Sequence, residues 1–417
     1  MIIISDKVYV YSVGMTKFGK FLDKGIKDLT REALKSVQED NEFDLNNIEA
    51  AWFSNTGWGM TDFQHSIRGQ VALTPNGVDK VPITNVENAC ASGSTAFNGA
   101  WTAIKAGVFD CALAIGTEKV YQEDRAKMMD GFITYTDVEQ TRALMAQMQK
   151  AAKERAEKAA SQNGGEKKGK KGGHSVFMDF YAAGARGHMK EYGTTQRHLA
   201  EIAAKNHNNS TMNPLAQYTF PMTVDQVMED YEVAYPLTRA MCAPVGDGSA
   251  AAVLCSEKFL KEHPNDKAIL VRASILRSGS WKKDNVSQRS STAAYKMAGL
   301  SPKDINVAEV HDATAYGELE QIEQMGFCGL GQGGVLTESG ETQIGGKIAV
   351  NPSGGLLSRG HPLGASGLAQ IYELVTQLRG DAGKRQVDKH QYALAENGGG
   401  TIGSGPAAMC VHILEAI

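Results

Sequence analysis

Cys90 is the first residue in the sequence whose surroundings favour chemistry. It follows the short strand-like run PITNVENA, and the small residues ASGS after it let the backbone turn tightly into a helix. A thiol at a helix N-terminus meets unpaired N–H groups and the positive end of the helix dipole, which favour the nucleophilic thiolate. The alternative is that Cys90 is a small buried hydrophobe, the commonest fate of a free cysteine. We interpret it as a candidate nucleophile, because its small neighbours also leave room for a substrate.

Three further stretches place polar residues or glycines where strands end or helices begin. His311 ends the strand-like run INVAEV and begins the stretch HDATAYGELEQIEQMGFC. His361 lies in NPSGGLLSRGHPLGASG. Glu396 begins ENGGGTIGSG, which carries glycines 398 to 400. Each has a structural explanation as well. His311 and the aspartate after it could be a hydrogen-bonding pair, and the glycines could only permit a bulge or tight turn.

The elements that must position these residues occur twice in the chain. DLNNIEAAWFSNTG (44–57) matches SPKDINVAEVHDAT (301–314), each after an alanine-rich helix. ASGSTAFNGAWTAIKAG followed by ALAIGTE matches GASGLAQIYELVTQLRG followed by ALAENGG, each a small-residue helix that ends at glycine before an Ala-Leu-Ala strand. Strands that alternate with helices predict parallel βαβ units, so each half should be a layered α/β domain.

The repeats divide the chain into two halves and a segment between them. We expect an N-terminal half over 1–120 plus part of 121–265, a loop domain over 121–265, and a C-terminal half over 266–417. The loop domain carries a Lys/Gly-rich insertion near 150–174, in the run QKAAKERAEKAASQNGGEKKGKKGGH. This run is either a solvated loop or a set of lysines that meets phosphates of a ligand or an acidic partner.

Composition excludes several classes of protein. The chain has 417 residues, 42% of them hydrophobic, and a formal net charge of −4. It is therefore long enough for a large buried core and offers no overall attraction to nucleic acid or an anionic membrane. Asp6 and Lys7 interrupt the apolar start, so we expect no signal peptide or membrane span. Six cysteines lack CxxC pairs, as expected of a reduced, cytoplasmic protein, and no metal site is predicted.

Together, ACASG around Cys90, the HD pair at 311, GHPLGASG and the terminal ENGGG resemble the thiolase family over nearly the whole chain. HD and YPLTRAMCAPVGDGSAA are similar to the branch that includes the sterol-carrier-protein-type thiolases. The resemblance implies the thiolase fold, with two duplicated βαβ halves in five α-β-α-β-α layers and an inserted loop domain. It also implies coenzyme A as a substrate, with no metal or redox cofactor, and a homodimer.

The resemblance assigns a role to each candidate residue. Cys90 would attack the ketone of a 3-oxoacyl-CoA and become acylated, and His361 would take its proton. His311 would join His361 in an oxyanion site for the thioester oxygen. The N–H of one of glycines 398 to 400, with Gly398 as the first choice, would pair with the N–H of Cys90 in the other oxyanion hole.

The sequence departs from the family pattern at the second cysteine, which protonates the leaving enolate and deprotonates the incoming CoA. Glu396 stands where this cysteine occurs in many members if Gly398 is the oxyanion glycine; a register shifted by one puts Asn397 there, with Gly399 in the hole. In the sterol-carrier-type branch the second cysteine instead follows the HD pair, and this sequence has Ala313 at that position. A buried carboxylate with a raised pKa could replace the thiol. Otherwise Glu396 is a strand-end carboxylate in solvent or in a salt bridge.

The resemblance thus implies a thiolase that cleaves a bulky 3-oxoacyl-CoA with free CoA. A narrower similarity is to catalytic subunits that cleave benzoylsuccinyl-CoA to an aromatic acyl-CoA and succinyl-CoA in anaerobic toluene breakdown; this branch works with a small OB-fold/zinc-ribbon partner. Two alternatives remain open at this point. One is an acyltransferase that makes diketones by Claisen condensation, and the other is a non-catalytic acyl-CoA or lipid binding protein.

Overall fold

The structure is a computed structural model that describes residues 7–124, 128, 131–143, 145–147, 176–282, 284–403 and 405–417. The Lys/Gly-rich insertion predicted near 150–174 lies outside these residues. In the described part, ten strands form one mixed sheet in the order β10-β9-β11-β12-β8-β1-β7-β4-β2-β3. The strands of this sheet are β1 (Val8–Met15), β2 (Ala50–Ser54), β3 (Ile83–Val86), β4 (Cys111–Glu118), β7 (Gly248–Ser256), β8 (Ile269–Ser278), β9 (Val307–Glu309), β10 (Ala349–Val350), β11 (Tyr392–Ile402) and β12 (Gly405–Ala416).

The strand order confirms the duplicated fold. Read outward from the centre, β1-β7-β4-β2-β3 and β8-β12-β11-β9-β10 have the same arrangement, and β1 pairs with β8 where the halves meet. The matched segments of the sequence fall on equivalent strands, β2 with β9 and β4 with β11. In both halves these two strands pair in parallel, as the βαβ pattern predicts.

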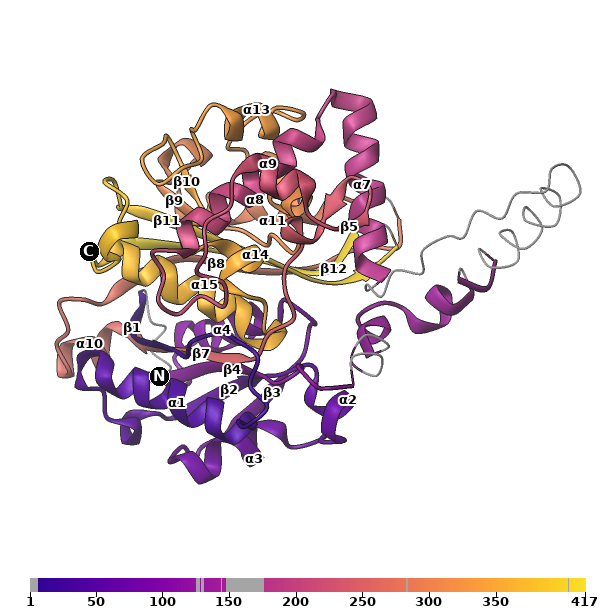
Figure 1. The fold of residues 1–417 in the computed structure, drawn as a ribbon. Helices are drawn as coiled ribbons and strands as arrows, with labels where there is room; N and C mark the ends of the chain where they lie inside the picture. The colour runs from indigo at the N-terminus through magenta and orange to yellow at the C-terminus, as the bar shows by residue number, and fades with distance from the viewer. Residues whose placement is uncertain are drawn as a thin grey trace, which may run out of the picture.

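Helices cover both faces of each half and separate the two halves. The helices are α1 (Ile26–Glu39), α2 (Trp58–Asp62), α3 (Arg68–Leu73), α4 (Ser92–Lys105), α7 (Val176–Tyr192), α8 (Gln196–Ser210), α9 (Val224–Glu229), α10 (Glu257–Glu262), α11 (Val286–Ala298), α12 (Ala315–Gln324), α13 (Gly333–Glu338), α14 (Gly355–Arg359) and α15 (Leu363–Leu378). The equivalent helices α4 and α15 pack together in the centre, in one buried core with strands of both halves (Figure 1). Helix α1 covers the outer face of one half and α11 that of the other, which completes the five layers.

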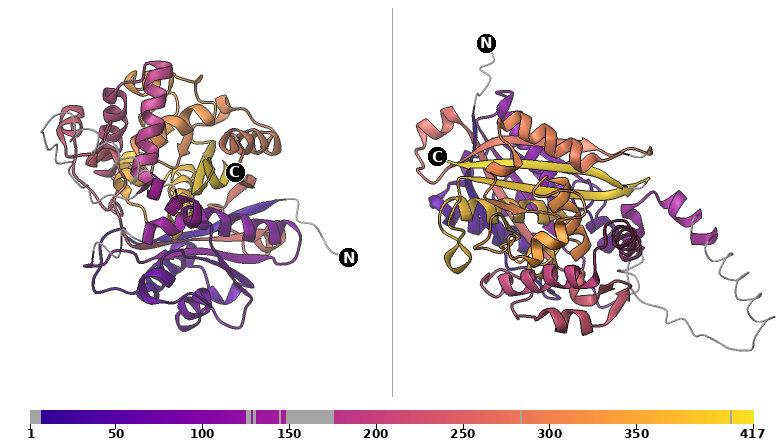
Figure 2. Two further views of the ribbon diagram at one scale, coloured as in Figure 1. Left: turned by 90° about the vertical axis from the view of Figure 1, so that its right-hand side faces the viewer. Right: turned by 90° about the horizontal axis from the view of Figure 1, so that it is seen from above.

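The segment between the halves contributes to both. Strand β7 returns to the N-terminal half, where it pairs with β1 and β4. Before it, α7, α8 and α9 form a separate apolar core with α12 and Leu357 of the C-terminal half. The views in Figure 2 place these magenta helices beside the orange and yellow C-terminal half. A small strand pair, β5 (Glu232–Ala234) with β6 (Leu237–Thr238), belongs to the same segment. Among the described residues, no helix has the length and apolar character needed to span a membrane.

Candidate active site

Cys90 lies in the tight loop between β3 and α4, just before the helix, as the sequence predicted. Ala89 has a φ of 48°, a left-handed conformation that is unusual for alanine and turns the chain sharply ahead of the cysteine. Two hydrogen bonds hold the loop: the Asn88 N–H donates to Ser92 Oγ at 2.8 Å, and the Ala89 N–H to Glu87 Oε1 at 2.7 Å. The strained turn presents the thiol in front of α4.

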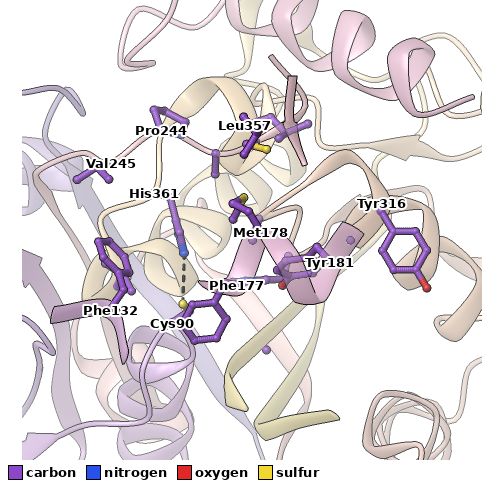
Figure 3. A pocket seen from close by; sticks show the side chains of 18 of the residues that line it. Cys90, Phe132, Phe177, Met178, Tyr181, Pro244, Val245, Tyr316, Leu357 and His361 are labelled. Carbon is purple, nitrogen blue, oxygen red and sulfur yellow. Dashed lines mark hydrogen bonds between the residues drawn. The ribbon is translucent and has the colours of Figure 1, made fainter. Parts of the chain in front are cut away.

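His361 is the immediate partner of Cys90. It lies between α14 and α15, and its Nε2 is 3.3 Å from Cys90 Sγ (Figure 3). Its Nδ1 is 2.7 Å from Ser366 Oγ, and the Ser366 hydroxyl donates to the carbonyl of Pro362 at 2.9 Å. Since the hydroxyl proton is used there, Ser366 Oγ accepts a hydrogen bond from Nδ1–H. Nε2 is therefore unprotonated and faces the thiol as a base.

His311 follows β9 and joins the same group. The amide Nδ2 of Asn397 donates to His311 Nδ1 at 2.9 Å, so the ring proton is on Nε2, where it is free to donate. The ring centroids of His311 and His361 are 5.3 Å apart. Cys90 Sγ and one ring nitrogen of each histidine all lie within 4.8 Å of one another. The structure thus brings together three residues from loops that are far apart in sequence.

Asp312 has a separate, structural role. Its carboxylate accepts from the N–H groups of Leu356, at 2.6 Å, and Leu357, and from Asn206 Nδ2 at 2.8 Å. It therefore caps the first turn of α14 and does not pair with the His311 ring. The HD pair combines a site histidine with a residue that fixes the segment leading to His361.

Among glycines 398 to 400, Gly400 provides the N–H nearest to the chemistry. Its N–H and that of Cys90 itself act on the cysteine sulfur and lower the pKa of the thiol. Gly399 packs without space for a side chain against Asn88 and Ala91, which brings β11 up to the Cys90 loop. Gly398, the first choice from the sequence, lines the cavity next to Met409 and Glu396. Gly400 is one of the three glycines that the sequence offered, two residues after Gly398 along β11.

Glu396 is fully buried at the start of this glycine run and lines the cavity. Its Oε2 accepts from the His311 backbone N–H at 2.8 Å, whereas its Oε1 has no hydrogen-bond partner in the described structure. No ion pair to it is found among the described residues. Glu396 is therefore neither of the strand-end alternatives, a carboxylate in solvent or in a salt bridge.

Burial sets the protonation of the site. It raises the pKa of the Cys90 thiol to about 12, against the opposing effect of the Cys90 and Gly400 N–H groups. Burial, followed by the neighbouring His311 and Arg359, lowers the pKa of His361 well below its usual range, and burial lowers the pKa of His311 to about 4. The helix terminus predicted a resting thiolate, whereas these pKa directions favour a neutral thiol beside a neutral imidazole.

A cavity of about 860 Å³ opens onto the thiol. Aromatic and sulfur-containing side chains make up much of its wall, and Figure 3 shows several of them grouped around Cys90 and His361. The wall includes Phe132, Tyr135, Phe177, Met178, Phe180, Tyr181, Tyr316 and Met409. Such a wall suits a large, apolar acyl group, because aromatic side chains bury much apolar area with little loss of conformational freedom.

Sequence reasoning missed three supporting residues. Ser366 orients His361, and Asn397, considered only as an alternative acid/base position, orients His311. Glu118, at the end of β4, is fully buried and accepts from Asn55 Nδ2 and from the N–H groups of Gly57 and Gly364. Ser366 lies inside the quoted GHPLGASG, where a serine next to the base was an available signal. The sequence carries no such signal for Glu118, because nothing near ALAIGTE indicates which groups the glutamate contacts.

The structure places a cysteine–histidine pair in an apolar cavity of a duplicated α/β fold. The chain matches two family models: "Thiolase, N-terminal domain" over residues 8–236 and "Thiolase C-terminal domain-like" over residues 272–415. It therefore belongs to the thiolase family and is an acyl-CoA acyltransferase of the thiolase type, with coenzyme A as a substrate.

Relatives of known name agree with this placement. Acetyl-CoA acetyltransferase of Methanothermobacter thermautotrophicus is 37% identical, with 98% of this chain and 99% of the relative covered. Sterol carrier protein 2 of Bos taurus is 34% identical over 94% of this chain and 70% of the relative. Among solved structures, the "Ltp2-ChsH2(DUF35) aldolase" has a TM-score of 0.75 at 19% identity, with 99% of both chains covered. Human mitochondrial 3-ketoacyl-CoA thiolase has a TM-score of 0.67 at 16% identity, with 98% of both chains covered. Both structures support the thiolase fold.

Proposed function

We propose that this enzyme cleaves a bulky 3-oxoacyl-CoA with free CoA through an acyl-enzyme on Cys90. The observation that carries the proposal is the 3.3 Å contact between Cys90 Sγ and His361 Nε2, inside a cavity with an aromatic wall. We assign Cys90 as the nucleophile, His361 as its base, and His311 and Gly400 as oxyanion donors; Gly398 stays a candidate for the last role.

Acylation starts from the neutral pair. Cys90 Sγ bonds to the ketone carbon while its proton passes to His361 Nε2, and the Cys90 and Gly400 N–H groups stabilise the oxyanion that forms. Collapse of this adduct breaks the carbon–carbon bond. It leaves an acyl-enzyme thioester and the enolate of a shorter acyl-CoA, whose oxygen the Nε2–H groups of His311 and protonated His361 face. An acid then protonates the enolate carbon.

Thiolysis completes the cycle. A base removes the proton of the CoA thiol, whose sulfur attacks the acyl-enzyme and forms the second acyl-CoA. Cys90 leaves as a thiolate and recovers its proton from His361. The proton that protonates the enolate is thereby replaced by the proton from CoA, so the enzyme returns to its starting state.

The cavity wall supports an aromatic acyl group, and we propose benzoylsuccinyl-CoA as the substrate. In that reaction the benzoyl group would pass to Cys90, beside Phe132, Phe177 and Tyr181, and succinyl-CoA would leave. A benzoyl ring fits edge-to-face or offset contacts with such side chains. We also propose a small OB-fold/zinc-ribbon partner subunit. The name of a structural neighbour, the "Ltp2-ChsH2(DUF35) aldolase", supports a second component.

Mass spectrometry of the intact enzyme tests the proposal. Incubation with acetyl-CoA, a long-chain acyl-CoA and benzoyl-CoA should add the benzoyl mass to Cys90 most completely. Cys90→Ser should form no adduct and keep the thermal unfolding midpoint, because the change is nearly isosteric and a serine hydroxyl is far less acidic than a thiol. An adduct on Cys90→Ser would contradict the nucleophile. Adducts with acetyl-CoA alone would contradict the aromatic substrate.

A further inference from the structure

The position of Glu396 bears on the acid and base steps that the mechanism leaves without a residue. The family's second cysteine is missing, and the other five cysteines do not replace it. Cys111, Cys255 and Cys410 are buried, and burial raises the pKa of Cys410, on β12 beside β11, to about 12. Cys328 lies outside the residues that line the cavity. Cys242 lines it, but its Sγ donates to the carbonyl of Thr238 at 3.4 Å.

Glu396 has the geometry that these steps require. One carboxylate oxygen is held by the His311 backbone N–H at 2.8 Å, which fixes the group next to the candidate oxyanion donor. The other oxygen is buried, has no hydrogen-bond partner in the described structure, and belongs to a residue that lines the cavity with Cys90 and His361. An unpartnered buried oxygen costs free energy, because it has lost its contact with water without gaining a hydrogen bond. A carboxyl group held on one side and free on the other is therefore ready for a bound substrate.

We propose that the free oxygen of Glu396 is the second acid/base of the reaction and performs the task of the missing cysteine. This inference rests on the proposed function. In the first half, Glu396–COOH gives its proton to the enolate carbon and becomes a carboxylate. In the second half, the carboxylate takes the proton of the CoA thiol and becomes Glu396–COOH again. No oxidant or further reactant is needed, and the protons balance over one turnover.

The protonation of Glu396 fits this order of events. Burial raises its pKa to about 8, partly offset by the His311 N–H and increased by the charge of Glu320 on α12. Near pH 7 the group is thus mostly protonated, as the first step requires, and a pKa close to the working pH allows efficient transfer in both directions. Other titratable groups around it are the Tyr181 hydroxyl on α7, the Cys410 thiol on β12 and the His311 ring.

Hydrogen exchange in D₂O at the α-carbon of succinyl-CoA, the acyl-CoA whose enolate leaves in the proposed reaction, isolates the proposed step. Glu396→Gln should still be acylated on Cys90, since an amide oxygen can accept from the His311 N–H, but should lose about 10²–10⁴-fold in exchange rate. Glu396→Cys should recover most of that loss, because a thiol at this position is what the family uses. The matched control is Glu373→Gln, which replaces a buried carboxylate paired with Arg385 outside the cavity and should keep exchange.

The pH dependence of the exchange rate is a second readout. It would not follow the pKa of Glu396 if this residue had only a structural role. Removal of the α-hydrogen needs the carboxylate, so wild-type exchange should rise with pH and level off above about pH 8, following the pKa of Glu396. In Glu396→Cys the rise should move to higher pH. Exchange at the wild-type rate in Glu396→Gln would overturn the inference, and so would loss of Cys90 acylation in that variant. A wild-type enzyme that acyl-CoAs never acylate would instead overturn the proposed function.

Discussion

At the scale of single residues, the proposed reaction starts from a neutral Cys90–His361 pair and not from a preformed ion pair. Burial raises the pKa of the Cys90 thiol and lowers that of His361, so the proton stays on sulfur until attack begins. The hydrogen bonds of Ser366 and Asn397 decide which nitrogen of each histidine carries a proton. In the proposed mechanism, these two hydrogen bonds suit the His361 ring to the role of base and the His311 ring to the role of donor.

Alkylation of Cys90 by iodoacetamide tests this arrangement. The rate should rise with pH across about pH 6 to pH 9 without a plateau near neutrality, because the thiolate fraction is still growing at a pKa of about 12. His361→Ala should slow alkylation by about 10²-fold or more at neutral pH, the lower range of a general-base effect. His311→Ala should slow turnover more than alkylation, since it removes a donor to the substrate.

Ser366→Ala is the finer control on the same pair. It keeps the His361 ring and removes the acceptor of its Nδ1–H, so a smaller loss of alkylation is expected than in His361→Ala. Equal rates in the wild type and His361→Ala would argue against the base. Equal rates in the wild type and Ser366→Ala would argue only against the role of the serine in fixing the tautomer.

At the scale of elements, the two halves meet where α15 of one half lies on β4 of the other. Gly116 on β4 makes this approach possible, since a β-carbon there would overlap the carbonyl oxygen of Gly364 and the side chain of Ser54. Glu118, on the same strand, accepts from the Gly364 N–H at 3.0 Å and fixes the first turn of α15. That turn follows His361, so the contact between the halves also positions the base.

Gly116→Ala should therefore destabilise the protein by about 1–3 kcal/mol or more, because the backbone of α15 cannot move away without shifting the site. The matched control is Gly187→Ala in α7, where a β-carbon meets nothing within 4 Å. This change should stabilise by about 0.5–1 kcal/mol, since alanine favours a helix over glycine. Urea unfolding followed by circular dichroism measures both. A Gly116→Ala protein as stable as the wild type would contradict the tight contact.

The elements were predictable from the sequence to the extent that their signals are local. The duplicated Ala-Leu-Ala strands and small-residue helices are side-chain patterns, and they led correctly to β4, β11, α4 and α15. Cys90, His311 and His361 all follow or precede such elements, so their meeting at one end of the sheet could be anticipated from the family resemblance. The sequence could not show which glycine faces the thiol, because a shift of one residue along β11 changes which N–H points at the cysteine.

Protonation was the other feature beyond local reasoning. The helix terminus before α4 is visible in the sequence, but the depth of burial around Cys90 depends on β11, α15 and the segment before β7 packing together. The same holds for Glu396, whose neighbours along the chain say nothing of its missing hydrogen-bond partner. Burial by distant segments raises the pKa of both groups, which favours a neutral thiol at Cys90 and suits Glu396 to acid/base chemistry.

At the scale of the whole molecule, β3 leaves an edge of the ten-stranded sheet uncovered by another strand among the described residues. The carbonyl of Pro82 accepts from Ala51 on β2 and that of Val86 from Asn55 just after β2, so the alternate residues of β3 direct their backbone groups outward. Thr84 and Asn85 are exposed. An exposed edge of this kind is a template for pairing with another strand, and a second copy of the chain across a two-fold axis would satisfy it.

We therefore expect a homodimer, with a mass by light scattering of twice 44.8 kDa at micromolar concentration. Asn85→Pro should shift the mass toward the monomer, because proline removes an outward N–H from the edge. Thr84→Ala keeps every backbone group and should remain a dimer, so it is the matched control. Far-ultraviolet circular dichroism should be alike in all three proteins. A wild-type monomer would contradict the prediction, and a dimeric, folded Asn85→Pro protein would place the interface away from β3.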